Sequence, residues 1–300
     1  MDWDKLRIFH AVAQAGSFTR AGEILALSQS AVSRQISALE ESLKVPLFHR
    51  HARGLILTEQ GEALFETVHD VSGKLAMAEA IVGESRDEPT GELRITTTVG
   101  FGSLWLTPRL GEFLDRYPDI TITVLVDDRE LDLSMREADV GIRMRASTQP
   151  DLVQRRLFRI HHHLYASPAY LQRFGAPQRL ADLDRNQRLI VWGTNVPAPV
   201  PEINWLLHID AGPIGIRQSV LKVNSTYGLL TAVESGAGIA SLPDYLATPL
   251  LKEGRLTRVL PDVEGPVNDA YFVYPEELRN SKRIAIFREF VLGKVAEWEF

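Results

Sequence analysis

Residues 28–39 contain the pattern that decides the fold of the N-terminal part: Ser28-Gln29-Ser30-Ala31-Val32-Ser33-Arg34-Gln35-Ile36-Ser37-Ala38-Leu39. Val32, Ile36 and Leu39 recur at steps of three and four residues, which predicts a helix with one apolar face. Ser28 is a residue type that caps helices, so we expect the helix to begin directly after it. The opposite face carries amide, hydroxyl and guanidinium groups, from Gln29, Ser30, Ser33, Arg34 and Ser37. Such a face can exchange hydrogen bonds with another molecule.

Two shorter helices are predicted before this one. The first has an apolar stripe that includes Leu6, Phe9 and Val12, and it ends near Gly16. The second runs from Phe18 to Ala26, and only two or three residues separate it from the third. So short a connection makes two helices cross steeply, which predicts a helix-turn-helix.

A basic hairpin is predicted after the third helix. Residues 47–57 have apolar ends and a middle that contains Arg50, Arg53 and Gly54, which is typical of a small β-hairpin or wing. From Ser42 to Thr58 there are three positive charges and no acidic residue. This patch suits contacts with phosphates, although an ordinary basic loop has the same composition.

A long helix is predicted after the hairpin. Thr58 and Glu59 suit its first turn, and the helical pattern runs to about Glu88. Its apolar residues follow a heptad spacing, which predicts a coiled-coil seam between two copies of the chain. Packing of this helix within its own domain remains the alternative. The seam residues are Leu64, Val68, Val71, Leu75, Ala78 and Val82.

The rest of the chain alternates between strand and helix patterns after a break at Pro89-Thr90-Gly91. This alternation predicts a mainly parallel sheet with helices on both faces. The first strands are expected at Glu92–Thr98, Ile120–Val126 and Ala138–Arg143, with helices at Ser103–Arg116 and Leu131–Glu137. A second set of patterns over residues 164–242 predicts a second α/β subdomain. We leave open whether the final strand (Ala270–Tyr274) and helix (from Ser281) return to the first.

The composition is that of a folded protein with more than one domain. The chain has 300 residues, 45% of them hydrophobic, and a formal net charge of −6. The absence of cysteine excludes disulfides, thiolate nucleophiles and zinc–thiolate sites. Residues 61–88 hold seven acidic and two basic residues, so the net acidity does not exclude DNA binding by the N-terminal part. Without a membrane-length apolar run or a signal-peptide pattern, we expect a cytoplasmic protein.

The N-terminal segment resembles the LysR-type transcriptional regulators, because several blocks occur in the order and spacing of that family. These blocks are Phe9-His10-Ala11-Val12-Ala13, Gly16-Ser17-Phe18-Thr19-Arg20-Ala21, residues 28–36, Leu47-Phe48-His49-Arg50 and Thr58-Glu59-Gln60-Gly61. Looser similarity to the effector domain of the family is carried by Gly91-Glu92-Leu93-Arg94-Ile95, Ala138-Asp139-Val140-Gly141-Ile142-Arg143 and residues 236–243. Gly22 departs from the alanine often found there, and Ser30 from a common proline.

The resemblance implies an α+β multidomain fold. It implies a winged helix-turn-helix DNA-binding domain at 1–58, a linker and dimerisation helix at 59–88, and a two-subdomain α/β effector domain at 91–300 that is similar to periplasmic binding proteins. Subdomain I would contain about 91–163 plus 267–300, and subdomain II about 164–266. The implied function is sequence-specific regulation of transcription, controlled by a small molecule, without enzymatic activity.

DNA contacts are expected from two places. Arg34 would bind guanine and Gln29 adenine in the major groove, with Ser30, Ser33 and Ser37 on the same face. Arg50 and Arg53 of the wing would contact phosphates. The expected partners are promoter DNA with an interrupted palindrome, further copies of this chain in a dimer or tetramer, and RNA polymerase. The alternative for the helix is a solvated polar face.

An effector site is expected between the two subdomains. Residues 96–103 join a strand to a helix, and free backbone N–H groups at that helix start would hold an anion. By analogy with the family, the site residues would be Thr98, Gly100, Ser103, Arg143 and Ser225. A capping or turn role is the alternative for each of them.

No metal, cofactor or catalytic site is expected. His161 and His163 would share one face of a strand, but no further ligand lies near them in the sequence. Trp105 stands where a dinucleotide-binding fingerprint requires glycine, and no catalytic motif is present. Two other classes remain: a solute-binding protein, which would need an export signal, and an enzyme, which would need a catalytic constellation.

Overall fold

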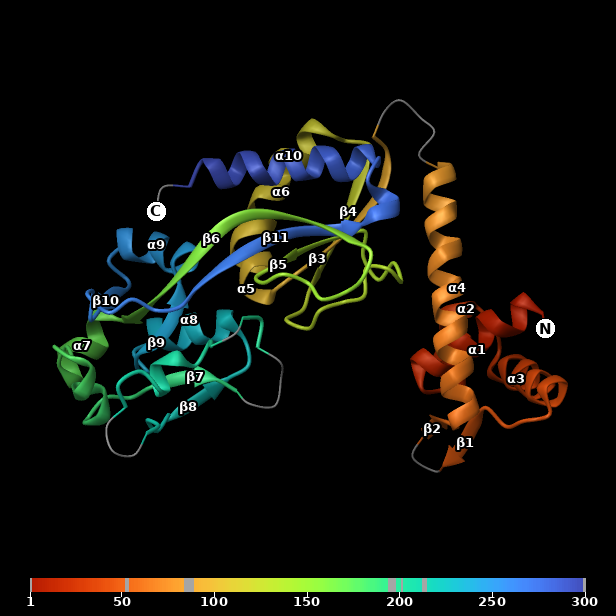
Figure 1. The fold of residues 1–300 in the computed structure, drawn as a ribbon, viewed down its shortest axis with the longest axis horizontal. Helices are drawn as coiled ribbons and strands as arrows, with labels where there is room; N and C mark the ends of the chain where they lie inside the picture. Colours follow the sequence, from red (N-terminus) through yellow and green to blue (C-terminus); the bar gives the residue numbers. More distant parts are fainter. Residues whose placement is uncertain are drawn as a thin grey trace. The chain divides into compact units, whose positions relative to one another are not determined.

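A computed structural model divides the chain into two compact units (Figure 1). One contains Met1–Gly83 and the short segment Ser134–Arg136, and the other contains Glu84–Leu133 and Glu137–Phe300. The structure describes residues 2–51, 54–83, 89–193, 198–200, 202–211 and 215–298.

Three helices form the centre of the N-terminal unit: α1 (Trp3–Ala15), α2 (Phe18–Leu25) and α3 (Gln29–Leu43). Their apolar faces meet in one core that includes Phe9, Val12 and Ile36, all fully buried. Gly16 ends α1 in the left-handed region, with φ of 61°, and its N–H donates to the Val12 carbonyl at 3.0 Å. The three predicted helices are confirmed.

The connection between α2 and α3 is tight. Ala26 adopts a left-handed φ of 53°, and the Leu27 N–H donates to the Gly22 carbonyl at 2.9 Å. A Cβ atom on Gly22 would lie 2.6 Å from the Leu27 carbonyl oxygen. Gly22 therefore permits this close approach, although glycine costs about 1 kcal/mol relative to alanine inside a helix. The predicted helix-turn-helix is confirmed.

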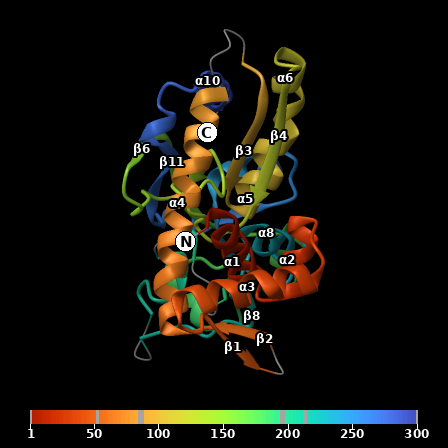
Figure 2. The same cartoon turned by 90° about the vertical axis from the view of Figure 1, so that its right-hand side faces the viewer.

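The predicted wing is an antiparallel hairpin of β1 (Phe48–His51) and β2 (Gly54–Leu57). The Glu40 carboxylate of α3 accepts backbone N–H groups from Leu47 at 2.8 Å and Phe48 at 3.3 Å. These bonds fix the start of the hairpin to α3, and Figure 2 shows the two elements beside each other.

The long helix α4 (Glu59–Gly83) begins where it was predicted, and residues 84–88 lie outside the described residues. Thr58 caps it: the hydroxyl accepts the Gly61 N–H at 3.0 Å and donates to the Pro46 carbonyl at 2.8 Å. Val68 is buried, whereas Val71 and Leu75 are 40% and 45% exposed. Leu64 and Val68 of the predicted seam thus pack within the unit, Val71, Leu75 and Ala78 are exposed, and the side chain of Val82 lies outside what the structure describes.

A pair of histidines joins α1 to α4. Nε2 of His10 lies 2.7 Å from Nδ1 of His69, and both rings stack on Phe65. Burial, and secondly the neighbouring His69, lower the pKa of His10 to about 4. His10 is therefore neutral in the folded unit near pH 7.

The C-terminal unit is built on a seven-stranded sheet in the order β10-β6-β11-β5-β3-β4, with β9 also paired to β6. Its strands are β3 (Gly91–Thr97), β4 (Ile120–Val126), β5 (Val140–Arg143), β6 (Leu152–Ala166), β9 (Ala240–Pro243), β10 (Thr257–Val259) and β11 (Val267–Pro275). Strands β7 (Ile190–Trp192) and β8 (Leu221–Val223) form a separate parallel pair.

Helices pack around these strands. The α-helices are α5 (Val99–Phe101), α6 (Leu110–Arg116), α7 (Pro168–Phe174), α8 (Thr226–Glu234), α9 (Asp244–Lys252) and α10 (Lys282–Ala296). A π-helix (Gly102–Leu106) and a 3₁₀ turn (Thr107–Arg109) join α5 to α6, and further 3₁₀ turns occupy Leu180–Asp184, Trp205–Leu207 and Glu276–Leu278. No helix among the described residues is long and apolar enough to cross a membrane.

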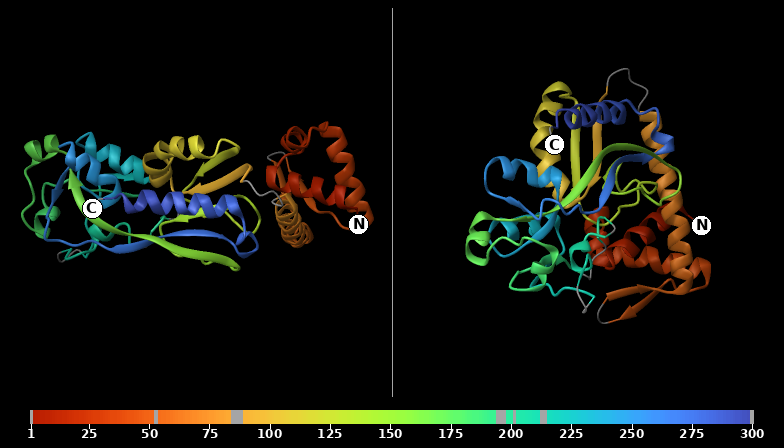
Figure 3. Two further views of the ribbon diagram at one scale, coloured as in Figure 1. Left: turned by 90° about the horizontal axis from the view of Figure 1, so that it is seen from above. Right: turned by 60° about the vertical axis from the view of Figure 1, so that its left-hand side comes forward.

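The prediction of a mainly parallel sheet is wrong. Strand β3 is parallel to β4 and β5, but β11 is antiparallel to both β5 and β6. The 15-residue strand β6 runs beside β11 through both halves of the unit (Figure 3). The first half contains β3, β4, β5, α5, α6 and α10, and the second half contains β7, β8, β9, β10, α7, α8 and α9. Arg155, Arg156 and Arg159 are exposed on strand β6, and their charges interrupt the apolar pattern by which a buried strand is predicted from sequence.

The predicted helix at Leu131–Glu137 is also wrong, because this segment forms turns. Besides one backbone bond, from the Glu137 N–H to the Asp132 carbonyl at 3.2 Å, its backbone groups bind side chains. The Asp132 N–H donates to the Glu137 carboxylate at 2.6 Å, and Gln149 accepts the Leu133 N–H at 3.1 Å and donates to the Leu131 carbonyl at 2.9 Å.

A buried guanidinium holds part of the second half of this unit together. The Arg217 side chain is 2% exposed, and its Nε lies 2.7 Å from the Asp184 carboxylate. It also donates to backbone carbonyls, including that of Leu206 at 2.9 Å. Because its charge is paired and hydrogen-bonded, this arginine is compatible with burial.

We expect Gly61→Ala to destabilise the N-terminal unit. A Cβ atom there would lie 2.1 Å from the Leu47 carbonyl oxygen, so α4 would have to move away from the wing. Overpacking of this kind costs about 1–3 kcal/mol. Gly111→Ala in α6 is the control, because a Cβ there meets nothing within 4 Å. Calorimetry should show a lower melting temperature of the N-terminal unit for Gly61→Ala alone; equal melting profiles would contradict the packing.

We expect acid to loosen the junction of α1 and α4. His10 is held neutral, so its contribution to stability is complete above pH 6.5 and is lost as the pH falls from 6.5 towards 4. After allowance for the half-exposed position, the loss is about 1 kcal/mol at pH 5. Urea unfolding of the N-terminal unit at pH 7.5 and 5.0 measures it. His10→Phe, which keeps the ring stacking, should reduce this pH dependence, and His49→Gln in the wing should leave it intact. An unchanged dependence in His10→Phe would refute the assignment.

Candidate DNA-binding helix and effector cleft

The polar face of α3 is open to solvent. Val32, Ile36 and Leu39 are fully buried against α1 and α2, which turns the opposite face outward. On that face Gln29, Ser30, Arg34 and Ser37 are exposed and Ser33 is half-buried. The Ser28 hydroxyl accepts the Ala31 N–H at 3.2 Å, so the predicted cap is confirmed. The first two turns of α3 thus present the predicted side chains together.

Arg34 is the cation of this face, and the wing contributes further positive charge. Arg34 makes no hydrogen bond or ion pair among the described residues, so its guanidinium is available to a partner. Arg50 lies in β1, where its backbone pairs with Leu55. The position of its side chain and all of Arg53 lie outside what the structure describes.

The C-terminal unit encloses a small cavity between its two halves, which we call the inner chamber. Its volume is about 20 Å³. Thr98 and Met144 reach it from the first half, and Ile160 and His162 from β6, which crosses between the halves. The second half supplies Pro199, Val200, Ile203, Thr226, Leu229, Ser241, Pro243 and Tyr245.

Three of the five predicted effector residues lie in or against this cleft. Thr98 lines the inner chamber. A Cβ atom on Gly100 would lie 3.1 Å from Cβ of Thr226, so α5 and α8 approach closely here. The Ser225 hydroxyl caps α8 by accepting the Gly228 N–H at 3.4 Å, directly before the lining residue Thr226.

The other two predicted residues do not line the inner chamber. Ser103 is exposed on the π-helix, and Arg143 is buried behind the end of β5. Arg143 donates from Nη2 to the Leu131 carbonyl at 3.4 Å, and its Nε has no partner among the described residues. Burial lowers the pKa of Arg143, and the charge of Glu130 opposes this effect.

The expectation of free N–H groups at the start of α5 is wrong for the first of these groups. The Val99 N–H donates to the Asp128 carboxylate at 3.1 Å. Burial raises the pKa of Asp128, whereas this hydrogen bond opposes the shift. A carboxylate of the chain itself therefore occupies one of the N–H groups at which an anion was expected.

His162 is the lining residue that sequence reasoning missed as a site residue. It is 5% exposed, and its Nε2 lies 2.9 Å from Oδ1 of Asn268 on β11. Burial lowers the pKa of His162 to about 4, so the ring is neutral near pH 7. The alternation of a strand would have placed His162 opposite its two histidine neighbours, but nothing in the sequence showed that this face borders a cleft.

His161 and His163 share the other face of β6, as predicted, with ring centroids 6.3 Å apart. The described residues contain no group of three or more histidine or carboxylate side chains placed to hold a metal ion. Desolvation lowers the pKa of His163, which favours its neutral form.

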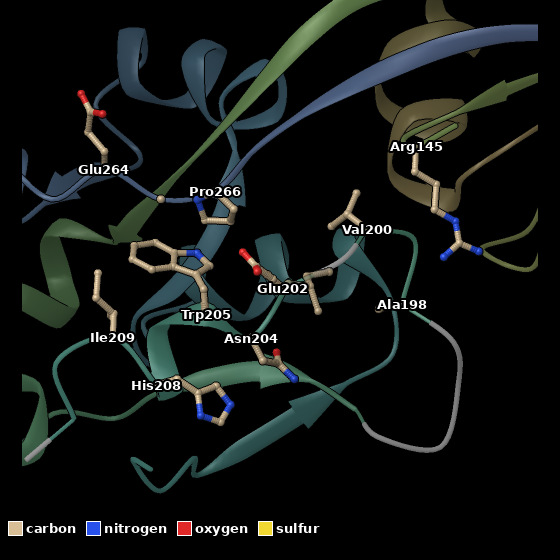
Figure 4. Close-up of a pocket in the computed structure, with 12 residues that line it drawn as sticks. Arg145, Ala198, Val200, Glu202, Asn204, Trp205, His208, Ile209, Glu264 and Pro266 are labelled. Carbon is tan, nitrogen blue, oxygen red and sulfur yellow. The ribbon is translucent and has the colours of Figure 1, made fainter. Parts of the chain in front are cut away.

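A larger pocket of about 1010 Å³, which we call the outer pocket, adjoins the inner chamber (Figure 4). The two share Val200 and Ile203. Trp205 of the outer pocket donates from Nε1 to the Ser241 hydroxyl of the inner chamber at 2.7 Å. Arg145 faces the outer pocket from the first half, and Glu202 and Glu264 line it from the second. The outer pocket thus lies directly beside the inner chamber.

Two family models match the chain. Residues 3–62 match "Bacterial regulatory helix-turn-helix protein, lysR family". Residues 86–296 match "LysR substrate binding domain", which covers the unit that contains the inner chamber and the outer pocket.

Relatives and solved structures match the chain along nearly its whole length. A Xanthomonas campestris "HTH-type transcriptional regulator" is 31% identical over 295 residues, 98% of this chain and 86% of the relative. The structure of CrgA from Neisseria meningitidis, a LysR-type transcriptional regulator, is 27% identical with a TM-score of 0.63, covering 99% of this chain and 100% of that one. The full-length virulence activator AphB of Vibrio cholerae is 25% identical with a TM-score of 0.64, covering 98% and 99%. The chain therefore belongs to the LysR family of transcriptional regulators, with a helix-turn-helix DNA-binding domain and an effector-binding domain.

Proposed function

We propose that this protein binds promoter DNA through α3 and the wing, and changes its action on that DNA when a small molecule binds between the two halves of the C-terminal unit. The observation that carries the proposal is the exposed polar face of α3 with the unpartnered Arg34. A catalytic role is not part of the proposal. The protein would act in the cytoplasm, where it can reach promoter DNA.

The roles of the DNA-contacting residues follow from their chemistry. Arg34 offers a planar fork of donors to guanine, and Gln29 can donate to and accept from adenine, with Ser30, Ser33 and Ser37 beside them. Arg50 and Arg53 of the wing add phosphate contacts, which supply affinity but no sequence preference. Selectivity would thus depend on α3.

The active form is a dimer or tetramer of this chain. Val71, Leu75 and Ala78 are exposed at heptad spacing along α4, which suits an antiparallel coiled coil between copies. The DNA-binding domains of two copies would then contact the two halves of an interrupted palindrome. A change in how the subunits are arranged would alter the DNA complex and its use by RNA polymerase.

Each function is assigned to one part of the chain: DNA binding to residues 1–58, dimerisation to residues 59–88 and effector binding to residues 91–300. Within the last, subdomain I (about 91–163 plus 267–300) and subdomain II (about 164–266) would close on the effector. Thr98, Gly100 and Ser225 are the proposed effector contacts that border the cleft, whereas Ser103 and Arg143 would act from outside the inner chamber.

We expect Arg34→Ala to weaken binding to a selected duplex site by roughly 5- to 150-fold, which corresponds to about 1–3 kcal/mol for a base contact. Fluorescence anisotropy at several salt concentrations, on the selected and on a scrambled duplex, measures both affinity and selectivity. Arg7→Ala in α1 is the control, because Arg7 is an exposed arginine of the same unit that lies near Asp4, at 3.8 Å. If the Arg34 variant keeps the full preference for the selected site, its proposed base contact is wrong. Absence of salt-sensitive DNA binding by the unaltered protein would overturn the proposed function itself.

A further inference from the structure

The inner chamber is lined without a formal charge. None of the twelve lining residues that the structure describes is a lysine, arginine, aspartate or glutamate. Most of the lining is apolar, and the polar groups are hydroxyls and one imidazole. The inner chamber therefore offers hydrogen bonds but no counter-ion.

The imidazole of His162 is held in one hydrogen-bonding role. Asn268 donates from Nδ2 to the Met144 carbonyl at 2.6 Å, which turns its Oδ1 towards His162. Since Oδ1 can only accept, Nε2 of His162 carries the ring proton and donates to it at 2.9 Å. In the neutral ring Nδ1 is then a lone-pair acceptor. A ligand that meets this atom must donate a hydrogen bond.

The charges that act on the lining residue Tyr245 are negative. Asp128 binds the N–H of Val99, next to the lining residue Thr98, and its charge raises the pKa of the lining residue Tyr245 after the larger effect of burial. Asp244, beside Tyr245 in α9, acts on the same phenol. Both carboxylates repel a second negative charge brought into the cleft.

The outer pocket also has more negative than positive side chains in its lining. Its charged lining residues are Arg145, Glu202 and Glu264, and Arg145 already lies 3.7 Å from Glu130. An anion in the outer pocket would meet two carboxylates and one arginine that already has a carboxylate partner. An uncharged molecule meets no such barrier.

We infer that the effector is an uncharged molecule, apolar over most of its surface, that donates one hydrogen bond to Nδ1 of His162 and exchanges another with the hydroxyl of Thr226 or Thr98. A carboxylate is excluded because its two oxygens only accept hydrogen bonds, as does Nδ1 of His162, and because the described lining contains no cation. This inference rests on the proposed function, in which the cleft is the effector site.

The size of the inner chamber connects this ligand to a conformational change. A volume of about 20 Å³ holds little more than a water molecule. A larger molecule must separate Thr98 and Met144 of the first half from Thr226 and Ser241 of the second. Binding of an uncharged molecule is thus coupled to movement between the two halves.

Matched pairs of small probe molecules test whether the inner chamber prefers an uncharged ligand to an anion. The intact protein is titrated with isobutyramide and isobutyrate, and with benzamide and benzoate, and binding is followed by saturation-transfer NMR and thermal shift. The members of each pair have nearly the same shape, but the amide donates hydrogen bonds and the carboxylate carries a charge. We expect the amides to bind and the carboxylates not to bind.

Variants assign the binding to the inner chamber. Thr226→Val keeps the shape of the side chain and removes the hydroxyl, so it should weaken amide binding roughly fivefold, the effect of one hydrogen bond. Thr231→Val is the matched control, because Thr231 is exposed on the same helix and donates to the Gly228 carbonyl at 3.0 Å. Thr98→Val serves as a second lining variant if Thr226→Val does not fold.

Two results would overturn the inference. In the first, the carboxylates bind with an affinity equal to or higher than that of the amides, and Thr226→Val abolishes this binding. In the second, none of the four probes binds. The same preparations are assayed for salt-sensitive DNA binding, which separates the two claims. If the carboxylates bind and DNA binding is intact, the inference of an uncharged effector is wrong but the proposed regulatory function is not affected. If the protein does not bind DNA, the proposed function is wrong, whichever probes bind.

Discussion

The antiparallel pairing of β6 with β11 is the constraint on which the effector-binding unit depends. Both strands continue through the two halves of the unit, so each half is anchored to the same pair of backbones. The pair also builds the cleft: His162 on β6 is hydrogen-bonded to Asn268 on β11, and Ile160 faces the same inner chamber. Because this pairing passes between the halves, any movement of one half against the other must bend these strands beside the cleft.

Much of the N-terminal unit could be predicted from the sequence because its signals are local. The caps at Ser28 and Thr58, the left-handed Gly16 and the apolar face of α3 each act within a few residues, and the structure has all four. Gly22 could not be interpreted in this way. Its role depends on the Leu27 carbonyl that the turn brings back against α2, so a local propensity scale shows only its cost.

The effector cleft was predicted less well because its chemistry depends on distant contacts. Asp128 occupies the N–H of Val99 from another strand end, Arg143 turns to the Leu131 carbonyl, and Asn268 fixes the His162 ring from more than 100 residues away. None of these contacts leaves a pattern in the sequence. These contacts, together with the uncharged lining of the inner chamber, are the reason why we propose an uncharged ligand in place of the anion expected from the sequence.

The central claim is that α3 and the wing give this chain sequence-specific DNA binding as a paired structure. Selection of bound duplexes from a random pool by the intact protein, followed by sequencing, tests it most directly. The account predicts recovery of one motif made of two related half-sites in inverted order, with spacing that brings both into major grooves on one face of the duplex. Recovery of a random set of sequences, or of a single unrepeated half-site, would contradict it.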